Sequence, residues 1–158
     1  MRVFRIEREK YLESTLKGTG AAMTDGYRWN SINTYLVYTA DSRALATLEM
    51  SVHLDLSEDL PIDRFYVEIE IPDDIQILEL LFEDLPKGWD SKPPQIETQF
   101  IGDDFVEDGN AAILKVPSSI IPFEYNYLIN PNHPKAKTIT VISQTPLKFD
   151  ERLWSKEY

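Results

Sequence analysis

The chain has 158 residues, of which 42% are hydrophobic, and this length suits one domain with a single core of ordinary size. Its 16 Lys and Arg stand against 27 Asp and Glu, and the formal net charge of −11 argues against general nucleic-acid binding and against an anionic membrane. The chain has no cysteine and two histidines, which excludes disulfides, cysteine-ligated metals and a histidine-rich metal cluster.

The first ten residues are charged throughout and lack the apolar core of a signal peptide, so we expect a cytoplasmic protein. Residues 2–6 predict a short opening strand. Residues 12–23 are small and polar, which predicts a loop whose backbone approaches another segment closely. After a second polar loop, residues 35–39 form a continuous apolar run, which predicts a buried strand.

The segment after this strand predicts a helix at residues 42–54, capped by Asp41 or Ser42. At about 100° per residue, Glu49 falls within the arc of apolar side chains centred near Leu45. A carboxylate in that arc must be paired, protonated or facing a cavity, because an unpaired buried charge is too costly. Periodicity alone leaves three interpretations of Glu49 open. It could form a structural ion pair, extend to solvent from the edge of the apolar helix face, or be a functional carboxylate.

The remainder of the chain predicts five strands, at residues 65–71, 75–81, 111–116, 124–130 and 138–143. Residues 95–106 have weak helical spacing, and residues 85–94, rich in Pro, Gly and Trp, predict an ordered surface loop. Strands outnumber helices and rarely alternate with them. We therefore expect an α+β fold over residues 1–158, one domain with a mixed or antiparallel central sheet and flanking helices.

Besides Glu49, three residues look unusual for purely structural segments. Arg28 is a fixed cation beside an aromatic residue and just before a strand, although it would ordinarily be a surface charge. Tyr38 places a hydroxyl at the end of that strand. Ser118 directly follows a buried strand, where it can face a cleft or cap the turn after Pro117. No glycine-rich phosphate motif or Gly-x-Ser-x-Gly elbow accompanies them, so the residues indicate a site without indicating a reaction.

At these positions the sequence resembles the RES domain, the toxin half of bacterial RES–Xre toxin–antitoxin pairs. The arginine, glutamate and serine that name the family match Arg28, Glu49 and Ser118, and its tyrosine matches Tyr38. Tyr27 departs from the family, which often has a second glycine there, and this change would narrow the approach to Arg28. Further matching segments lie in order along nearly the whole chain, at residues 85–89, 99–103, 126–131 and 149–153.

The resemblance implies a fold similar to that of ADP-ribosyltransferase toxins and an enzyme that degrades NAD⁺. Inorganic phosphate would replace nicotinamide on the ribose, giving ADP-ribose-1″-phosphate, and the loss of NAD⁺ would arrest growth. NAD⁺ and phosphate would be substrates, with no resident cofactor or metal. The resemblance assigns catalysis to Arg28, Tyr38 and Glu49, and substrate binding to Arg28, Tyr38, Ser118 and Asn126.

These residue types suit that chemistry. Glu49 would stabilise positive charge on the ribose and hold a ribose hydroxyl. Arg28 would donate a bidentate hydrogen bond to the pyrophosphate or orient the attacking phosphate. Tyr38 would stack on nicotinamide or position the ribose, and Ser118 would hydrogen-bond the substrate.

Three alternatives remain open from the sequence. Water as the acceptor would make the protein an NAD⁺ glycohydrolase, and a protein or nucleotide acceptor would make it an ADP-ribosyltransferase. A non-catalytic module would use the same cleft only to hold a nucleotide or a partner. The resemblance implies a cognate Xre-type helix-turn-helix antitoxin that makes the DNA contact, no direct nucleic-acid or membrane binding by this chain, and compatibility with a homodimer inside the complex.

Overall fold

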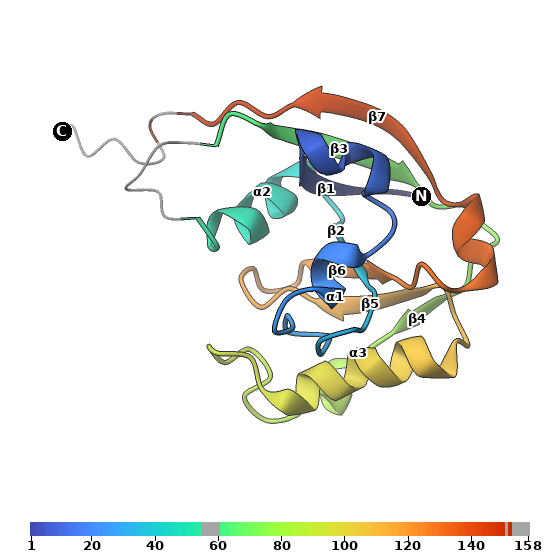
Figure 1. Cartoon of the computed structure of the whole chain (residues 1–158). Coiled ribbons are helices and arrows are strands. Elements are labelled where there is room, and N and C mark those ends of the chain that lie inside the picture. The colour runs from blue at the N-terminus through green and yellow to red at the C-terminus, as the bar shows by residue number, and fades with distance from the viewer. Residues whose placement is uncertain (55–60, 151, 153–158) are drawn as a thin grey trace.

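The computed structural model describes residues 1–54, 61–150 and 152, and in that part of the chain seven strands form one sheet (Figure 1). The strands are β1 (Arg2–Arg8), β2 (Val37–Ala40), β3 (Arg64–Glu70), β4 (Ile77–Glu79), β5 (Ile113–Pro117), β6 (Tyr125–Ile129) and β7 (Thr140–Pro146). The helices are α1 (Thr19–Ala22), α2 (Arg43–Ser51) and α3 (Ile96–Asp108), with 3-10 helices η1 (Glu9–Ser14), η2 (Phe82–Asp84) and η3 (Pro134–Thr138).

The sheet has the strand order β4-β5-β6-β2-β1-β3-β7. The pair β4–β5 is parallel and the other neighbouring pairs are antiparallel, so the sheet is mixed, as the sequence predicts. Figure 1 shows β1, β3 and β7 in the upper part of the molecule, β4, β5 and β6 in the lower part, and α3 beneath these lower strands. In sequence, α2 follows β2 directly, and in space it contacts both β1 and β2.

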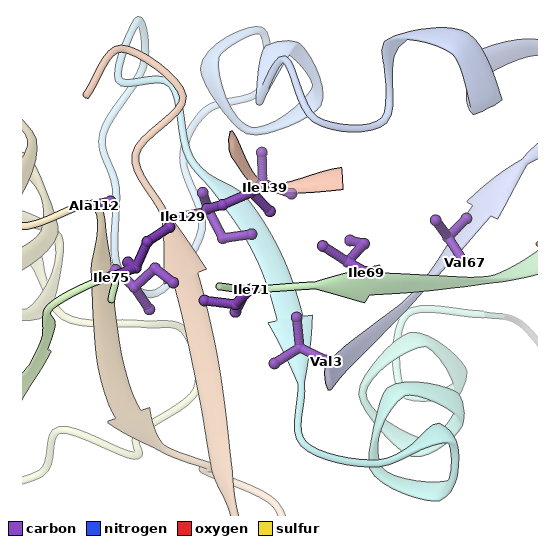
Figure 2. Packing of buried hydrophobic residues seen from close by; sticks show 10 residues of the cluster. Val3, Val67, Ile69, Ile71, Ile75, Ala112, Ile129 and Ile139 are labelled. Atoms are coloured by element: carbon purple, nitrogen blue, oxygen red, sulfur yellow. The ribbon is translucent and has the colours of Figure 1, made fainter. Parts of the chain in front are cut away.

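Three apolar clusters hold these layers together. The first gathers aliphatic residues of the sheet, including Val3, Val67 and Ile69, which are fully buried (Figure 2). The second packs α3 and the loop that precedes β2 against β5 and β6. The third places Leu45 and Ala46 of α2 against β1 and β2, and it is this packing that seats the helix on the sheet.

A set of polar contacts fixes α2 along its opposite side. The helix begins after Ser42, whose Oγ accepts a hydrogen bond from the backbone of Leu45 at 3.0 Å, as the predicted cap requires. Arg43 forms an ion pair with Glu68 of β3 at 2.7 Å. One turn later, the hydroxyls of Thr47 and Tyr66 lie 2.9 Å apart. The helix is therefore tied to β3 by residues of its first two turns.

Glu68 is a charged residue of β3, and yet it is only 8% exposed. Its carboxylate accepts hydrogen bonds from Arg2 at 2.8 Å, from Arg43 at 2.7 Å and from Ser143 at 3.2 Å. These three donors explain how a charged residue remains buried at the sheet surface.

The predicted strands and the two longer helices are confirmed, with boundaries shifted by a few residues. The expectation of a loop at residues 12–23 is only partly right, because η1 ends and α1 lies within that range. The strand after this loop begins at Val37, and Tyr35 is exposed. Residues 149–153, which the resemblance matches, lie partly outside the described residues, and residues 55–60, after α2, lie wholly outside them. No helix in the described part of the chain is long and apolar enough to cross a membrane.

Candidate functional site

Glu49 lies in the last turns of α2 and is half-buried. Its Oε1 accepts hydrogen bonds from Oγ of Ser118 at 2.8 Å and from Nδ2 of Asn126 at 2.7 Å. Within the described residues, Oε2 has no hydrogen-bond partner and no cation lies within 4.0 Å of the carboxylate. The carboxylate is thus oriented by two neutral donors through one oxygen, rather than paired with a cation.

Ser118 follows β5, and it is 5% exposed. Its Oγ accepts hydrogen bonds from the backbone N–H groups of Ile120 and Ile121, each at 3.1 Å. With those two acceptor positions used, the hydroxyl proton is directed to Glu49. The expected turn contact is confirmed, because the hydroxyl stabilises the turn after Pro117, and the same hydroxyl also contacts Glu49.

Asn126 lies on β6, paired in register with Val116 of β5 and with Ala40 of β2. This register brings its side chain to Glu49, 77 positions away in the chain. Three residues that the resemblance selected, Glu49, Ser118 and Asn126, thus form one hydrogen-bonded group from α2, the turn after β5 and the adjacent strand β6.

Arg28 lies in the loop between α1 and β2. Its Nη1 donates to the backbone oxygens of Trp89 at 2.5 Å and of Ser91 at 3.1 Å. Among the described residues, Nε and Nη2 have no hydrogen-bond partner and no carboxylate lies within ion-pair distance. Arg28 is therefore a half-buried cation held by neutral carbonyl groups, and most of its donors remain free of partners within the described chain.

Burial lowers the pKa of the Arg28 guanidinium below its usual value, and the negative charges of Asp90 and Glu49 partly oppose this effect. The guanidinium nevertheless stays protonated at any physiological pH, because an arginine side chain does not lose its proton in proteins.

The loop that carries Arg28 is fixed by α3. Oδ1 and Oδ2 of Asp103 accept hydrogen bonds from the backbone and hydroxyl of Ser31, at 2.9 and 2.6 Å. Gly102 is essential to this contact, since a Cβ there would overlap the backbone oxygen of Trp29. Trp29 itself is 3% exposed and stacks on the partly buried Trp89, with 6.1 Å between ring centroids, so the Trp29 ring belongs to the core and offers no binding platform.

Tyr38, on β2, has its hydroxyl fully engaged. The hydroxyl donates to Oδ1 of Asn30 at 2.7 Å and accepts from the backbone N–H of Trp29 at 3.2 Å. Burial raises the pKa of the Tyr38 hydroxyl far above its usual value, although the hydrogen bond from Trp29 acts to lower it. Tyr38 therefore connects the sheet to the loop that carries Arg28.

Asn30 completes this connection and was missed by sequence reasoning. It is fully buried, and its Nδ2 donates to the backbone oxygen of Ala21 at 3.1 Å. A loop residue gives no periodic signal, so its burial was not visible in the sequence; the nearby Trp29 was the only hint of an ordered loop.

The structure thus divides the predicted residues into two groups. Glu49, Ser118 and Asn126 are hydrogen-bonded together, while Tyr38 is joined to the loop of Arg28 through the backbone of Trp29 and the side chain of Asn30. In the described part of the chain, no group of three His, Asp or Glu residues is placed to hold a metal ion. The arrangement offers a carboxylate with one free oxygen for a cationic centre and a guanidinium with free donors for a phosphate.

The sequence matches the RES domain over residues 2–150. It is 41% identical over 148 residues to the Prs ADP-ribosylating toxin of Sphingobium sp. (strain YBL2), covering 92% of this chain and 91% of that protein. It is 37% identical over 155 residues to Toxin Res of Yersinia enterocolitica, covering 97% of this chain and 99% of that protein.

The fold is also similar to one chain in the crystal structure of the M. tuberculosis MbcT–MbcA toxin–antitoxin complex. The TM-score is 0.74 over 93% of this chain and 84% of that chain, at 15% sequence identity, so this likeness concerns the fold. The family match and the two relatives agree with the ordered motifs of the sequence. They show that the chain belongs to the RES domain family.

Proposed function

We propose that this protein is the toxin of a toxin–antitoxin pair and that it breaks the nicotinamide–ribose bond of NAD⁺, with inorganic phosphate as the acceptor. The observation that carries the proposal is the pairing of Glu49 with two neutral donors, Ser118 and Asn126. Arg28 is likewise held by neutral carbonyl groups and has no counter-ion among the described residues. An ordinary structural carboxylate and an ordinary structural arginine would instead neutralise each other.

The carboxylate of Glu49 suits the charge that develops in this reaction. When the bond between ribose C1 and the nicotinamide nitrogen breaks, its electrons leave with nicotinamide, which becomes neutral, and positive charge develops on the ribose. Ser118 and Asn126 fix the orientation of Glu49 without cancelling its charge, and Oε2 remains available for a ribose hydroxyl. Such preorganisation stabilises the transition state more than the bound substrate.

Arg28 would bind a phosphate group. Its fixed position follows from the two carbonyl contacts of Nη1, and Nε and Nη2 can donate together to a phosphate oxygen pair. That phosphate is either the pyrophosphate of NAD⁺ or the attacking inorganic phosphate, whose oxygen forms the new bond to ribose C1. Tyr38 acts in this scheme through its ring and through the loop that it holds, because its hydroxyl is already engaged.

The names of the two relatives, together with the toxin–antitoxin complex of similar fold, support a toxin that works with an antitoxin. We propose an Xre-type helix-turn-helix antitoxin as the partner, and we assign DNA binding to that partner because the net charge of this chain is −11. An acidic chain with a local cationic site suits a partner segment that covers the site.

The test is to incubate the purified, antitoxin-free protein with NAD⁺, with and without inorganic phosphate, and to identify the products by mass. Phosphate-dependent formation of nicotinamide and ADP-ribose-1″-phosphate is the expected result. Release of ADP-ribose at the same rate without phosphate would replace the proposal with a glycohydrolase. Stable NAD⁺ in both samples would contradict cleavage with either small acceptor.

A second candidate is transfer of ADP-ribose to a protein, and the 41% identity to a toxin named for ADP-ribosylating Prs favours it. The cleaved bond and the role of Glu49 would be the same, and a nucleophilic side chain would replace phosphate. Incubation with purified Prs and NAD⁺ separates the two, because transfer adds the mass of one ADP-ribose to Prs while phosphorolysis leaves Prs unmodified.

A further inference from the structure

Tyr27 stands next to Arg28 and against Tyr38. The two tyrosine rings meet edge to face, with centroids 5.4 Å apart and an interplanar angle of 77°. Tyr27 is 40% exposed, whereas the Tyr38 hydroxyl is buried and engaged with Asn30. Of this aromatic pair, Tyr27 is therefore the more exposed ring, and it directly precedes Arg28 in the chain.

The backbone of Tyr27 is held in place on both sides. Its carbonyl oxygen accepts a hydrogen bond from Nε2 of Gln99 at 3.1 Å, and it forms an isolated β-bridge with Asn30. The preceding Gly26 has a φ of +98°, and a Cβ there would lie 2.5 Å from the backbone oxygen of Asn30. A ring on such a fixed backbone loses little conformational freedom when a ligand binds.

We propose that Tyr27 binds the nicotinamide ring of NAD⁺, an assignment that rests on the proposed function. The nicotinamide ring of NAD⁺ is a cation, and the electron-rich face of a tyrosine attracts a cation within about 6 Å of its centroid. That charge disappears as the glycosidic bond breaks, because nicotinamide takes the bonding electrons. Tyr27 thus stabilises the bound substrate more than the transition state or the product, and it contributes to affinity rather than to the chemical step.

The matched variants are Tyr27→Ala, Tyr27→Phe and Tyr35→Ala. Tyr35 is 41% exposed and lies in the same inter-element segment before β2, but within the described residues its ring forms no aromatic pair with Tyr38. Titrations with NAD⁺ and with NADH, whose dihydronicotinamide ring is neutral, are made by calorimetry in a Glu49→Gln background to prevent turnover. Steady-state kinetics use the wild-type background.

Tyr27→Ala is expected to raise the Kd and KM for NAD⁺ about 3- to 30-fold, with a smaller change in kcat and little change in the Kd for NADH. Tyr27→Phe, which keeps the ring, and Tyr35→Ala should stay within about twofold of the parent protein. Three results would overturn the assignment. They are an equal loss of affinity for NAD⁺ and NADH in Tyr27→Ala, an unchanged Kd for NAD⁺ in Tyr27→Ala, or a loss of NAD⁺ affinity in Tyr27→Phe as large as that in Tyr27→Ala.

These outcomes are separate from the proposed function. If the protein binds NAD⁺ through Tyr27 but never cleaves it, the proposed reaction is refuted and the proposed contact between Tyr27 and nicotinamide stands. If the Tyr27→Ala variant cleaves NAD⁺ as well as the wild type, the proposed reaction stands and the proposed contact between Tyr27 and nicotinamide is refuted. No binding of NAD⁺ by the Glu49→Gln protein or by the wild type would refute both.

Discussion

Ser118 donates its hydroxyl proton to Oε1 of Glu49 over 2.8 Å, although 69 positions separate the two residues in the chain. The same hydroxyl oxygen accepts two backbone N–H groups of the turn that follows. The turn therefore fixes the Ser118 hydroxyl, and that hydroxyl orients the Glu49 carboxylate. The geometry of Glu49 thus depends on the turn that follows β5.

Replacing Ser118 should affect both stability and turnover. In Ser118→Ala, two backbone N–H groups lose their acceptor, which should lower the free energy of unfolding by about 1–3 kcal/mol. NAD⁺ turnover should fall about tenfold, because Asn126 still holds Glu49. Ser143→Ala is the matched control, since Ser143 also donates to a carboxylate, that of Glu68. The control should lose stability without a specific loss of kcat, and equal activity losses in the two variants would contradict a local role for Ser118.

Glu49 should be far more important for rate than for stability. Glu49→Gln keeps the volume and a hydrogen-bonding oxygen but removes the charge, so kcat for NAD⁺ loss should fall by about 10²–10³. Its Tm should stay within a few degrees of the wild type. Glu79→Gln, which removes an exposed carboxylate bound to Lys115, serves as the control for net charge. A Glu49→Ala protein that folds normally and retains full turnover would exclude the proposed role.

The contact between α3 and the loop of Arg28 predicts a contrast between two glycines. Gly102→Ala places a methyl group on the backbone oxygen of Trp29, so it should destabilise the fold by about 3 kcal/mol or more. The matching decrease in Tm is about 6–12 °C for a chain of this size. Gly20→Ala, in α1, meets no atom within 4 Å of the new Cβ and should leave Tm unchanged or raise it. Thermal unfolding followed by circular dichroism measures both, and similar Tm values would contradict the close approach.

Glu68 predicts an acid-dependent part of the stability. Burial acts to raise the pKa of the Glu68 carboxyl, but the hydrogen bond from Ser143 and the charges of Arg2 and Arg43 together bring it below its ordinary 4.5. The folded state therefore favours the ionised form. Its contribution to stability is complete above pH 4.5 and is lost as the pH falls through the lower folded pKa.

The variant Glu68→Gln should accordingly have a lower Tm than the wild type at neutral pH, and the difference should shrink as the pH falls below 4.5. Glu70→Gln, an exposed position on the same strand, should change Tm little at any pH. A Tm difference for Glu68→Gln that stays constant between about pH 3 and 7 would show that the ion pairs do not set the acid response.

The sequence predicted the elements that depend on local patterns. Ser42 capped a helix because a Ser before an apolar repeat accepts a backbone N–H, and residues 65–71 alternated because one strand face lies in the core. The position of Glu49 on the inner arc of α2 was also visible from periodicity. Its partners were not, because Ser118 and Asn126 reach it through strand register, which a single sequence does not specify.

Two features lay beyond local reasoning for the same physical cause. Glu68 lies among the polar residues of β3, and its burial depends on Arg2, Arg43 and Ser143, which lie on other elements. The carbonyl groups that hold Arg28 belong to the backbone of Trp89 and Ser91, so no pattern of side chains in the sequence predicts these contacts. The family resemblance supplied the residue types of the site, and the structure supplied what orients each one.

The span of the site along the chain also determines when it can form. Arg28 relies on carbonyl groups at residues 89 and 91, and Glu49 relies on Ser118 and Asn126. A growing chain that has emerged from the ribosome only as far as β5 lacks both of the donors that orient the carboxylate. The arrangement of charges can therefore be complete only after residue 126 has emerged from the ribosome. The site thus assembles late in the synthesis of each chain.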